Sequence, residues 1–152
     1  QSGHNMKYEE ITSVIIGCAF DVINELGSGF VESVYEKALL LVLRQKGISV
    51  REQVPVSVIF RDVHIASFTA DMVVADRVIV ELKAVKALAP EHAAQVINYL
   101  NASGIEVGCL LILEIHAWNT NALPATNVSP NTRTRLPPIL YVEQPYIIHA
   151  PP

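Results

Sequence analysis

Residues 78–84 read VIVELKA, a stretch that combines a strongly apolar strand pattern with two charges. The stretch is apolar enough for a strand in the centre of a sheet. Alternation along a strand places Glu81 and Lys83 on the same face. Because charged side chains are seldom buried without partners, the stretch predicts a central strand whose two charges form an ion pair or part of a site.

Segments of helical and strand periodicity surround this strand in a clear order. Apolar residues first recur at helical spacing, and glycines follow both segments that show it. The period then changes to that of strands, followed by a helix with Pro90 in its first turn. The predicted elements are helices over 8–26, 30–46 and 90–103, strands over 50–60, 65–74, 77–84 and 106–113, and a turn over 61–64. The order α-α-β-β-β-α-β predicts an α/β fold.

The chain of 152 residues is long enough for one domain with a substantial core. We interpret residues 1–5, QSGHN, as the remnant of an expression tag, and we expect the domain over residues 6–113. Residues 114–152 are rich in Pro, Asn and Thr and lack periodicity. They predict an irregular C-terminal tail with a short strand near residues 139–143.

Composition excludes several classes of protein. With 51% hydrophobic residues the chain is globular rather than disordered, and no apolar run approaches the roughly eighteen residues that span a bilayer. The net charge of -4 argues against a general nucleic-acid coat protein, but it allows an enzyme with a local basic groove. Cys18 and Cys109 lie in apolar surroundings without the spacing of a zinc site, and they predict buried, reduced thiols. We therefore expect a cytoplasmic protein without a membrane segment.

Counting along the predicted hairpin places a second acid opposite Glu81. If residues 75–77 form a three-residue turn, Val74 pairs with Val78 and Asp71 faces Glu81, with Cβ atoms about 5 Å apart. Two carboxylates this close repel each other, and a divalent cation such as Mg²⁺ or Mn²⁺ stabilises such a pair. Lys83 points to the same face. A structural ion pair between Asp71 and Lys83 is the alternative.

Two predicted helices carry further polar residues. In the helix over 90–103, His92, Gln95 and Tyr99 share one face and could position a phosphate or a metal-bound water. An ordinary solvated helix face is the alternative. Glu32 lies in the first turn of the second helix, where an acid is also favourable for the helix dipole.

The sequence Gly29-x-x-Glu32-x-x-Tyr35 resembles the signature of the GxxExxY proteins, a family within the PD-(D/E)XK nuclease superfamily. The resemblance continues through later motifs and covers roughly residues 8–113, so residues 6–113 would form the nuclease-like domain. It implies a restriction-endonuclease-like core, in which helices flank a mixed central β-sheet. Members of the superfamily are mostly Mg²⁺-dependent nucleases, and some have lost activity.

Carried onto this chain, the resemblance implies a complete catalytic set. Asp71 and Glu81 would bind Mg²⁺ or Mn²⁺ together with the backbone carbonyl of Leu82, and Glu32 would be a further acid and candidate ligand. Lys83 would be the catalytic lysine. Substrate-positioning roles would fall to the helix residues Gln95, Tyr99 and His92.

The resemblance implies hydrolysis of phosphodiester bonds in nucleic acid, with DNA favoured over RNA as the partner. A non-catalytic module with a nuclease fold, serving binding or assembly, is the alternative function. A homodimer is an open alternative to a monomer, because a symmetric pair can cut two strands. The resemblance stops before the tail: family members have an NFG turn after the last core strand, where this chain has LILEIHAWNTN.

Overall fold

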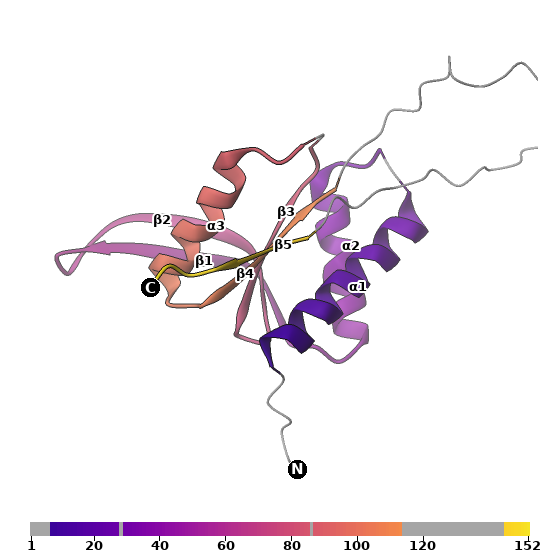
Figure 1. Ribbon diagram of the computed structural model, residues 1–152, viewed down its shortest axis with the longest axis horizontal. Coiled ribbons are helices and arrows are strands. Elements are labelled where there is room, and N and C mark those ends of the chain that lie inside the picture. The colour runs from indigo at the N-terminus through magenta and orange to yellow at the C-terminus, as the bar shows by residue number, and fades with distance from the viewer. Residues whose placement is uncertain (1–6, 28, 86, 114–144) are drawn as a thin grey trace, which may run out of the picture.

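The computed structural model describes residues 7–27, 29–85, 87–113 and 145–152 (Figure 1). These residues form an α/β fold in which helices flank a mixed sheet. The elements in chain order are α1 (Tyr8–Leu26), α2 (Glu32–Gln45), β1 (Val50–Phe60), β2 (Val63–Val74), β3 (Val78–Lys83), α3 (Pro90–Ser103), β4 (Val107–Ile112) and β5 (Tyr146–His149). The predicted α/β class and element order are confirmed over this part of the chain.

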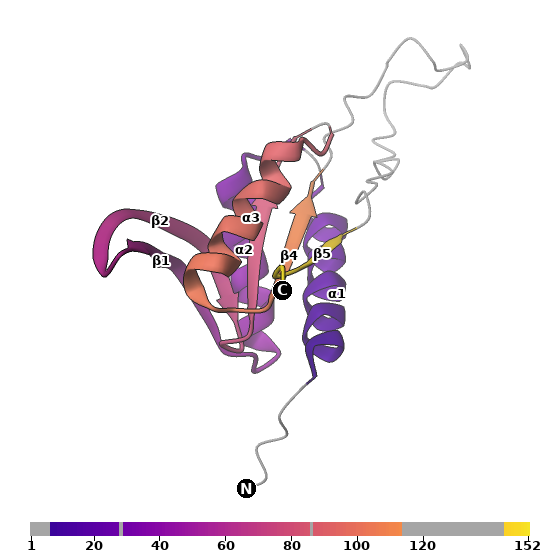
Figure 2. The ribbon, with the colours of Figure 1, turned by 60° about the vertical axis from the view of Figure 1, so that its left-hand side comes forward.

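The sheet has the strand order β1-β2-β3-β4-β5. Its strands pair antiparallel except for β3 and β4, which run parallel because the α3 segment crosses over between them. Helices α1 and α2 pack on one face, and α3 packs on the other (Figure 2). The central strands are thus covered on both faces, which explains their continuous apolar runs.

Strand β3 lies in the middle of this sandwich. Val78, Val80 and Leu82 pack into the core beneath α1 and α2, whereas Ile79 packs beneath α3. By alternation, Glu81 and Lys83 lie on the α3 side. The two charges noticed in the sequence therefore share one face, beneath a helix that carries polar residues.

The close contact between α3 and β4 depends on Gly108. A Cβ atom built on this glycine would collide with the side chain of Val96 on α3, and it would also touch Leu100. Gly108 therefore allows the helix to approach the strand without a gap.

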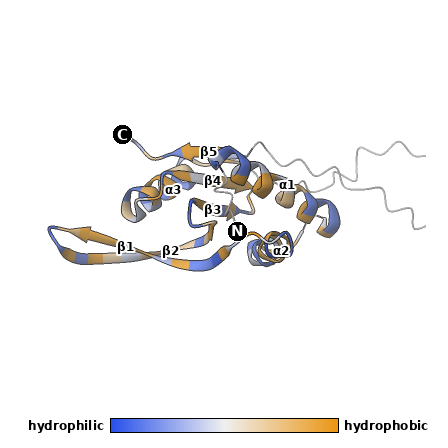
Figure 3. Cartoon of the chain, turned by 90° about the horizontal axis from the view of Figure 1, so that it is seen from below, coloured by the Kyte–Doolittle hydropathy of each residue, from blue (hydrophilic) through white to orange (hydrophobic). Residues whose placement is uncertain are grey.

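The hairpin of β1 and β2 projects beyond the rest of the sheet (Figure 1). Its turn consists of Arg61 and Asp62, both with left-handed φ (49° and 64°), so it is two residues shorter than the predicted turn over 61–64. The ladder runs from Val50 opposite Val74 to Phe60 opposite Val63, with a bulge after Val58. Figure 3 shows hydrophobic stretches, in orange, along this hairpin. Its large exposed apolar side chains are Ile59, Phe60, Val63, Ile65 and Phe68.

Strand β5 is the element that the sequence did not predict. Tyr146–His149 pairs antiparallel with β4, and the Ala150 N–H donates a hydrogen bond of 2.8 Å to the Glu106 carbonyl. The segment is only four residues long and shows no clear alternation, but it supplies partners to the open edge of β4. The short strand expected near 139–143 and the segment 1–5 lie outside the described residues.

Both cysteines are free and buried, as predicted. Burial raises the pKa of Cys109 to about 12, so this thiol stays protonated and inert. Among the helices of the described residues, none is long and apolar enough to cross a membrane.

Candidate active site

Asp71 and Glu81 meet where the ladder between β2 and β3 ends. The paired positions run from Val74 and Val78 to Met72 and Val80, which is the register counted from the sequence. At the next pair of positions, Asp71 and Glu81, hydrogen bonds from backbone N–H groups to side-chain carboxylates replace the hydrogen bonds of the backbone ladder. The Asp71 N–H donates to Glu81 Oε2 at 3.3 Å, and the Leu82 N–H donates to Asp71 Oδ2 at 2.9 Å. The two strands are therefore joined by their acids at this point.

Both acids ionise less readily than usual. Burial and, after it, the nearby charge of Asp71 raise the pKa of Glu81 to about 7, against the opposing effect of Lys83. Burial also raises the pKa of Asp71, while its hydrogen bond from Leu82 and the charge of Lys83 oppose the shift. The neighbouring protein charges thus compensate the two acids incompletely, and an added cation would favour their ionised forms.

Lys83 provides the positive charge of the site. Its Nζ lies 3.3 Å from Glu81 Oε1, and its side chain is 19% exposed whereas that of Glu81 is 2% exposed. Burial alone would lower the pKa of Lys83, but the charges of Glu81, Glu32 and Asp71 together raise it. Lys83 is therefore a charged side chain that reaches from a buried acid towards solvent.

Helix α3 holds Glu81 from above. Gln95 Nε2 donates hydrogen bonds to Glu81 Oε1 at 3.1 Å and to the Tyr99 hydroxyl at 2.7 Å. The Tyr99 hydroxyl in turn donates to the Thr69 carbonyl at 3.2 Å, and Tyr99 is only 4% exposed. A chain of hydrogen bonds therefore fixes the orientation of the Glu81 carboxylate relative to β2.

His92 takes a different place from the other two polar residues of α3. Its Nδ1 accepts a hydrogen bond of 3.1 Å from the Ala89 N–H, at the start of the helix. This contact caps α3 and fixes its first turn above the end of β3. The structure thus joins Gln95 and Tyr99 to the carboxylates and places His92 at the helix terminus.

Glu32 reaches the site from α2. Its Oε2 accepts a hydrogen bond of 2.9 Å from the Ala84 N–H, directly after Lys83. The start of α2 is therefore tied to the end of β3, 52 residues further along the chain.

The neighbouring motif residues hold the turn that places Glu32. Gly29 has a φ of +101°, which glycine adopts without strain. The Tyr35 hydroxyl donates to the Gly27 carbonyl at 2.7 Å and accepts from the Phe30 N–H at 3.3 Å. In the pattern Gly-x-x-Glu-x-x-Tyr, the glycine thus adopts the left-handed turn and the glutamate contacts the end of β3. The buried tyrosine holds the turn through hydrogen bonds to its backbone.

Glu36 and Gln53 were not identified from the sequence. Glu36 lies one helical turn after Glu32, so i, i+4 spacing was the available signal. Burial raises the pKa of Glu36, the hydrogen bond from Gln53 lowers it, and the charges of Asp71 and Glu32 raise it again. Gln53 has a left-handed φ of 48° and interrupts the ladder opposite Asp71. The group of acidic side chains around Asp71 therefore includes Glu32 and Glu36 of α2.

The donor set matches the chemistry of a hard divalent cation. Carboxylate and carbonyl oxygens of Asp71, Glu81, Glu32 and Leu82 are the ligand types that Mg²⁺ and Mn²⁺ prefer. The raised pKa values of Asp71 and Glu81 also fit a place for additional positive charge. Within the described ranges, however, no group of three or more His, Cys, Asp or Glu side chains lies close enough to hold a metal ion. A backbone carbonyl such as that of Leu82 would have to complete the set.

The fold and the site define a class of nuclease-like α/β proteins, in which an acid on one strand faces an acid-x-lysine motif on the next. The family model of the PD-(D/E)XK nuclease superfamily matches residues 9–120. The chain belongs to this superfamily. Asp71 and the triplet Glu81-Leu82-Lys83 have the residue types of such an arrangement, an acid together with an acid-x-lysine sequence.

One solved structure that the comparison matches to this chain is described as "Crystal structure of SSO0001". The comparison gives 14% sequence identity and a TM-score of 0.47, and it covers 95% of this chain. This chain spans 58% of the length of that protein. No curated protein gives a significant match to the sequence.

Proposed function

We propose that the protein is a metal-dependent nuclease that hydrolyses phosphodiester bonds of nucleic acid. The observation that carries this proposal is the meeting of Asp71 and Glu81 at the end of the ladder, with the ammonium group of Lys83 3.3 Å from Glu81. Membership of a nuclease superfamily supports the same function.

The contacts of the site residues support a role for each of them in this function. Asp71, Glu81 and the Leu82 carbonyl would hold Mg²⁺ or Mn²⁺, with Glu32 as a further candidate ligand. When bound, the cation activates a water molecule as the nucleophile and stabilises charge on the phosphate oxygens. The charged Lys83 can orient this water or stabilise negative charge that develops on the phosphate.

The α3 residues would position the catalytic groups. Gln95 orients Glu81 through its hydrogen bond, and the buried Tyr99 orients Gln95. His92 would act by fixing the start of α3. We therefore assign Tyr99 and His92 to positioning the site, while Gln95 remains a candidate for direct contact with substrate.

A cleavage assay tests the proposal. Labelled single-stranded DNA, duplex DNA and RNA are incubated with the protein and Mg²⁺ or Mn²⁺, and products are resolved by length. We expect cleavage that chelation abolishes and that Asp71→Ala and Lys83→Met reduce at least 100-fold. Circular dichroism shows that the variants are folded. Activity of the wild type that does not exceed that of Asp71→Ala on any substrate would refute the proposal.

A non-catalytic binding module is the second candidate, and one observation favours it. No cluster of three or more ligating side chains is assembled among the described residues. Such a module would bind nucleic acid without Mg²⁺, and Glu81→Gln would bind as well as the wild type. Calorimetric titration with Mn²⁺, combined with binding assays of Glu81→Gln, separates the two functions.

DNA rather than RNA as substrate and a homodimer as the assembly are also proposals. Competition between DNA and RNA of the same sequence tests the first. Light scattering coupled to size-exclusion chromatography tests the second, because a dimer would have twice the mass of 16.7 kDa.

A further inference from the structure

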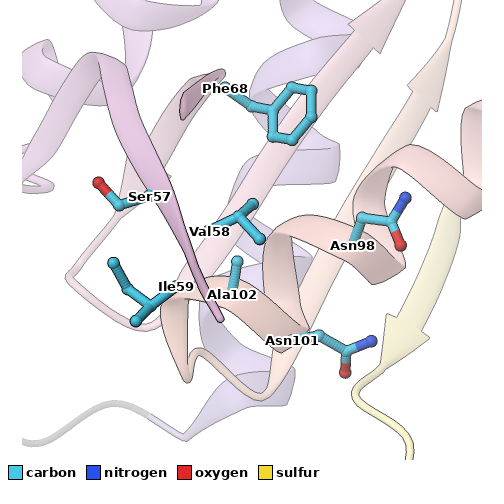
Figure 4. Close-up of a pocket in the computed structure, with 7 residues that line it drawn as sticks. All are labelled: Ser57, Val58, Ile59, Phe68, Asn98, Asn101 and Ala102. Carbon is cyan, nitrogen blue, oxygen red and sulfur yellow. The ribbon is translucent and has the colours of Figure 1, made fainter. Parts of the chain in front are cut away.

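A groove opens between the projecting hairpin and helix α3. It has a volume of about 470 Å³, and Figure 4 shows the hairpin on one side and the helix on the other. Its lining residues are Ser57, Val58, Ile59, Phe68, Asn98, Asn101 and Ala102. None of these seven side chains carries a charge.

The lining combines one aromatic ring with two amides. Phe68 is 49% exposed, so much of its side chain is accessible. Asn98 and Asn101 lie on the exposed side of α3, and each amide offers both a donor and an acceptor. This combination suits a flat ligand that stacks on a ring and presents a polar edge.

A nucleobase is such a ligand. Unstacked bases bind to proteins by stacking on aromatic side chains while their edges form hydrogen bonds with polar groups. A phosphate would require cationic side chains or clustered N–H donors, and the uncharged lining offers no cationic side chain. The groove therefore suits a base rather than the backbone of the strand.

The groove lies close to the candidate active site and is linked to it through side-chain contacts. The ring of Phe68 lies 6.2 Å from that of Tyr99, measured between centroids. Tyr99 leads through Gln95 to Glu81 by hydrogen bonds. Phe68 also precedes Asp71 by three residues on β2, a separation of about 10 Å along a strand. A base in the groove would thus belong to a nucleotide near the phosphate that is cut.

We propose that this groove binds an unpaired nucleobase, so that the protein prefers single-stranded nucleic acid over continuous duplex. The inference rests on the proposed nuclease function and names its substrate class. In a duplex the base faces are stacked and the edges paired, so neither Phe68 nor the two asparagines could reach them as described.

Binding measurements test this proposal without any cleavage. Fluorescence anisotropy in a chelating buffer gives the Kd of the full chain for labelled single-stranded DNA, for duplex DNA, and for an oligonucleotide with abasic positions; a single-stranded RNA is a further arm. We expect Phe68→Ala to weaken binding of the single strand about 5- to 100-fold. Phe68→Trp should retain it, and the matched control Phe60→Ala, at the exposed end of the hairpin, should leave it unchanged.

The abasic oligonucleotide identifies the base as the occupant. Wild type should bind it as weakly as Phe68→Ala binds the intact strand, and Phe68→Ala should lose little more. Asn98→Ala provides a second variant if Phe68→Ala does not fold. Equal loss of single-stranded and duplex binding in Phe68→Ala, or full affinity of the wild type for the abasic strand, would overturn the proposal.

Further outcomes distinguish this proposal from the proposed nuclease function and from an interface with a second copy of the chain. A protein that cuts single-stranded DNA equally well with and without Phe68→Ala would retain the nuclease function and refute the proposed role of the groove. A protein that has no cleavage activity and binds single strands through Phe68 would support the proposed role of the groove and refute the nuclease function. A change of mass in light scattering on Phe68→Ala, without a change in affinity, would assign the groove to a second copy of the chain and overturn the proposal.

Discussion

The carboxylate of Glu81 accepts a hydrogen bond from the backbone N–H of Asp71, 3.3 Å away on the neighbouring strand. Asp71 reciprocates by accepting from the N–H of Leu82 at 2.9 Å. The two acids thus replace backbone pairing at the place where the candidate cation would bind. Any cation that draws on these carboxylates would compete with hydrogen bonds that hold β2 against β3.

The raised pKa of Glu81 predicts an unusual dependence of stability on pH in metal-free buffer. The group ionises at its ordinary value of 4.5 in the unfolded chain but at about 7 in the folded protein. Between these values the folded state binds more protons, so stability falls as the pH rises and levels off above about 7. The loss is at most about 3 kcal/mol. Urea denaturation from pH 5 to 8 measures it, and a stability that rises over this range would contradict the prediction.

Glu81→Gln should separate stability from activity. The amide has the size of the carboxylate but no charge to bury, so we expect the variant to be about 1–2 kcal/mol more stable than wild type at pH 8 without metal. Cleavage should fall at least 100-fold, because a cation ligand is lost. Denaturation and cleavage assays measure the two effects. Asp21→Asn, at an exposed position of α1, is the control and should change neither.

Tyr99→Phe tests whether α3 positions Glu81. Loss of the hydroxyl removes the partner of Gln95 and leaves the Thr69 carbonyl without its donor, which should cost about 1–2 kcal/mol of stability. If Gln95 acts through Glu81, kcat should fall about 5- to 10-fold with little change in KM. Steady-state kinetics check this split. Tyr8→Phe, whose hydroxyl bonds Glu106 at the surface, should leave kcat unaltered.

Gly108→Ala tests the packing of α3 on β4. Because the new methyl group would collide with Val96, we expect a loss of about 1–3 kcal/mol of stability in denaturant titration. Gly17→Ala is the matched substitution. Gly17 lies exposed within α1 with open space at its Cβ position, so alanine should stabilise by up to about 1 kcal/mol. Equal effects of the two substitutions would contradict the packing argument.

The register of the acids could be predicted because strands have a period of two and the turn was short. Ala75 and Asp76 have left-handed φ values of 52° and 56°, and Val74 pairs with Val78 as counted. Local spacing is sufficient for such a pair. It also placed Gln95 and Tyr99 on the correct face of α3, because both extend from one helix towards the strand beneath it.

Residues whose roles depend on contacts between distant elements could not be predicted. Gln53 joins the site because β1 is irregular opposite Asp71, and Glu36 joins it because α2 packs beside that irregularity. The burial of Tyr99 depends on Phe68 and Thr69 of the hairpin. Strand β5 depends on an edge that only the folded sheet provides. Apart from the i, i+4 spacing of Glu32 and Glu36, none of these contacts leaves a periodic trace in the sequence.

The missing ladder pair between Gln53 and Asp71 also divides the hairpin into an inner and an outer part. Below it, β2 is paired on both sides over Met72–Val74, whereas its outer part, from Val63 to Ala70, is paired with β1 alone. Two-stranded ribbons twist more readily than wider sheets. Twisting therefore meets the least resistance from strand pairing in the outer hairpin, which lines the groove, whereas Met72–Val74 next to Asp71 are held between two strands.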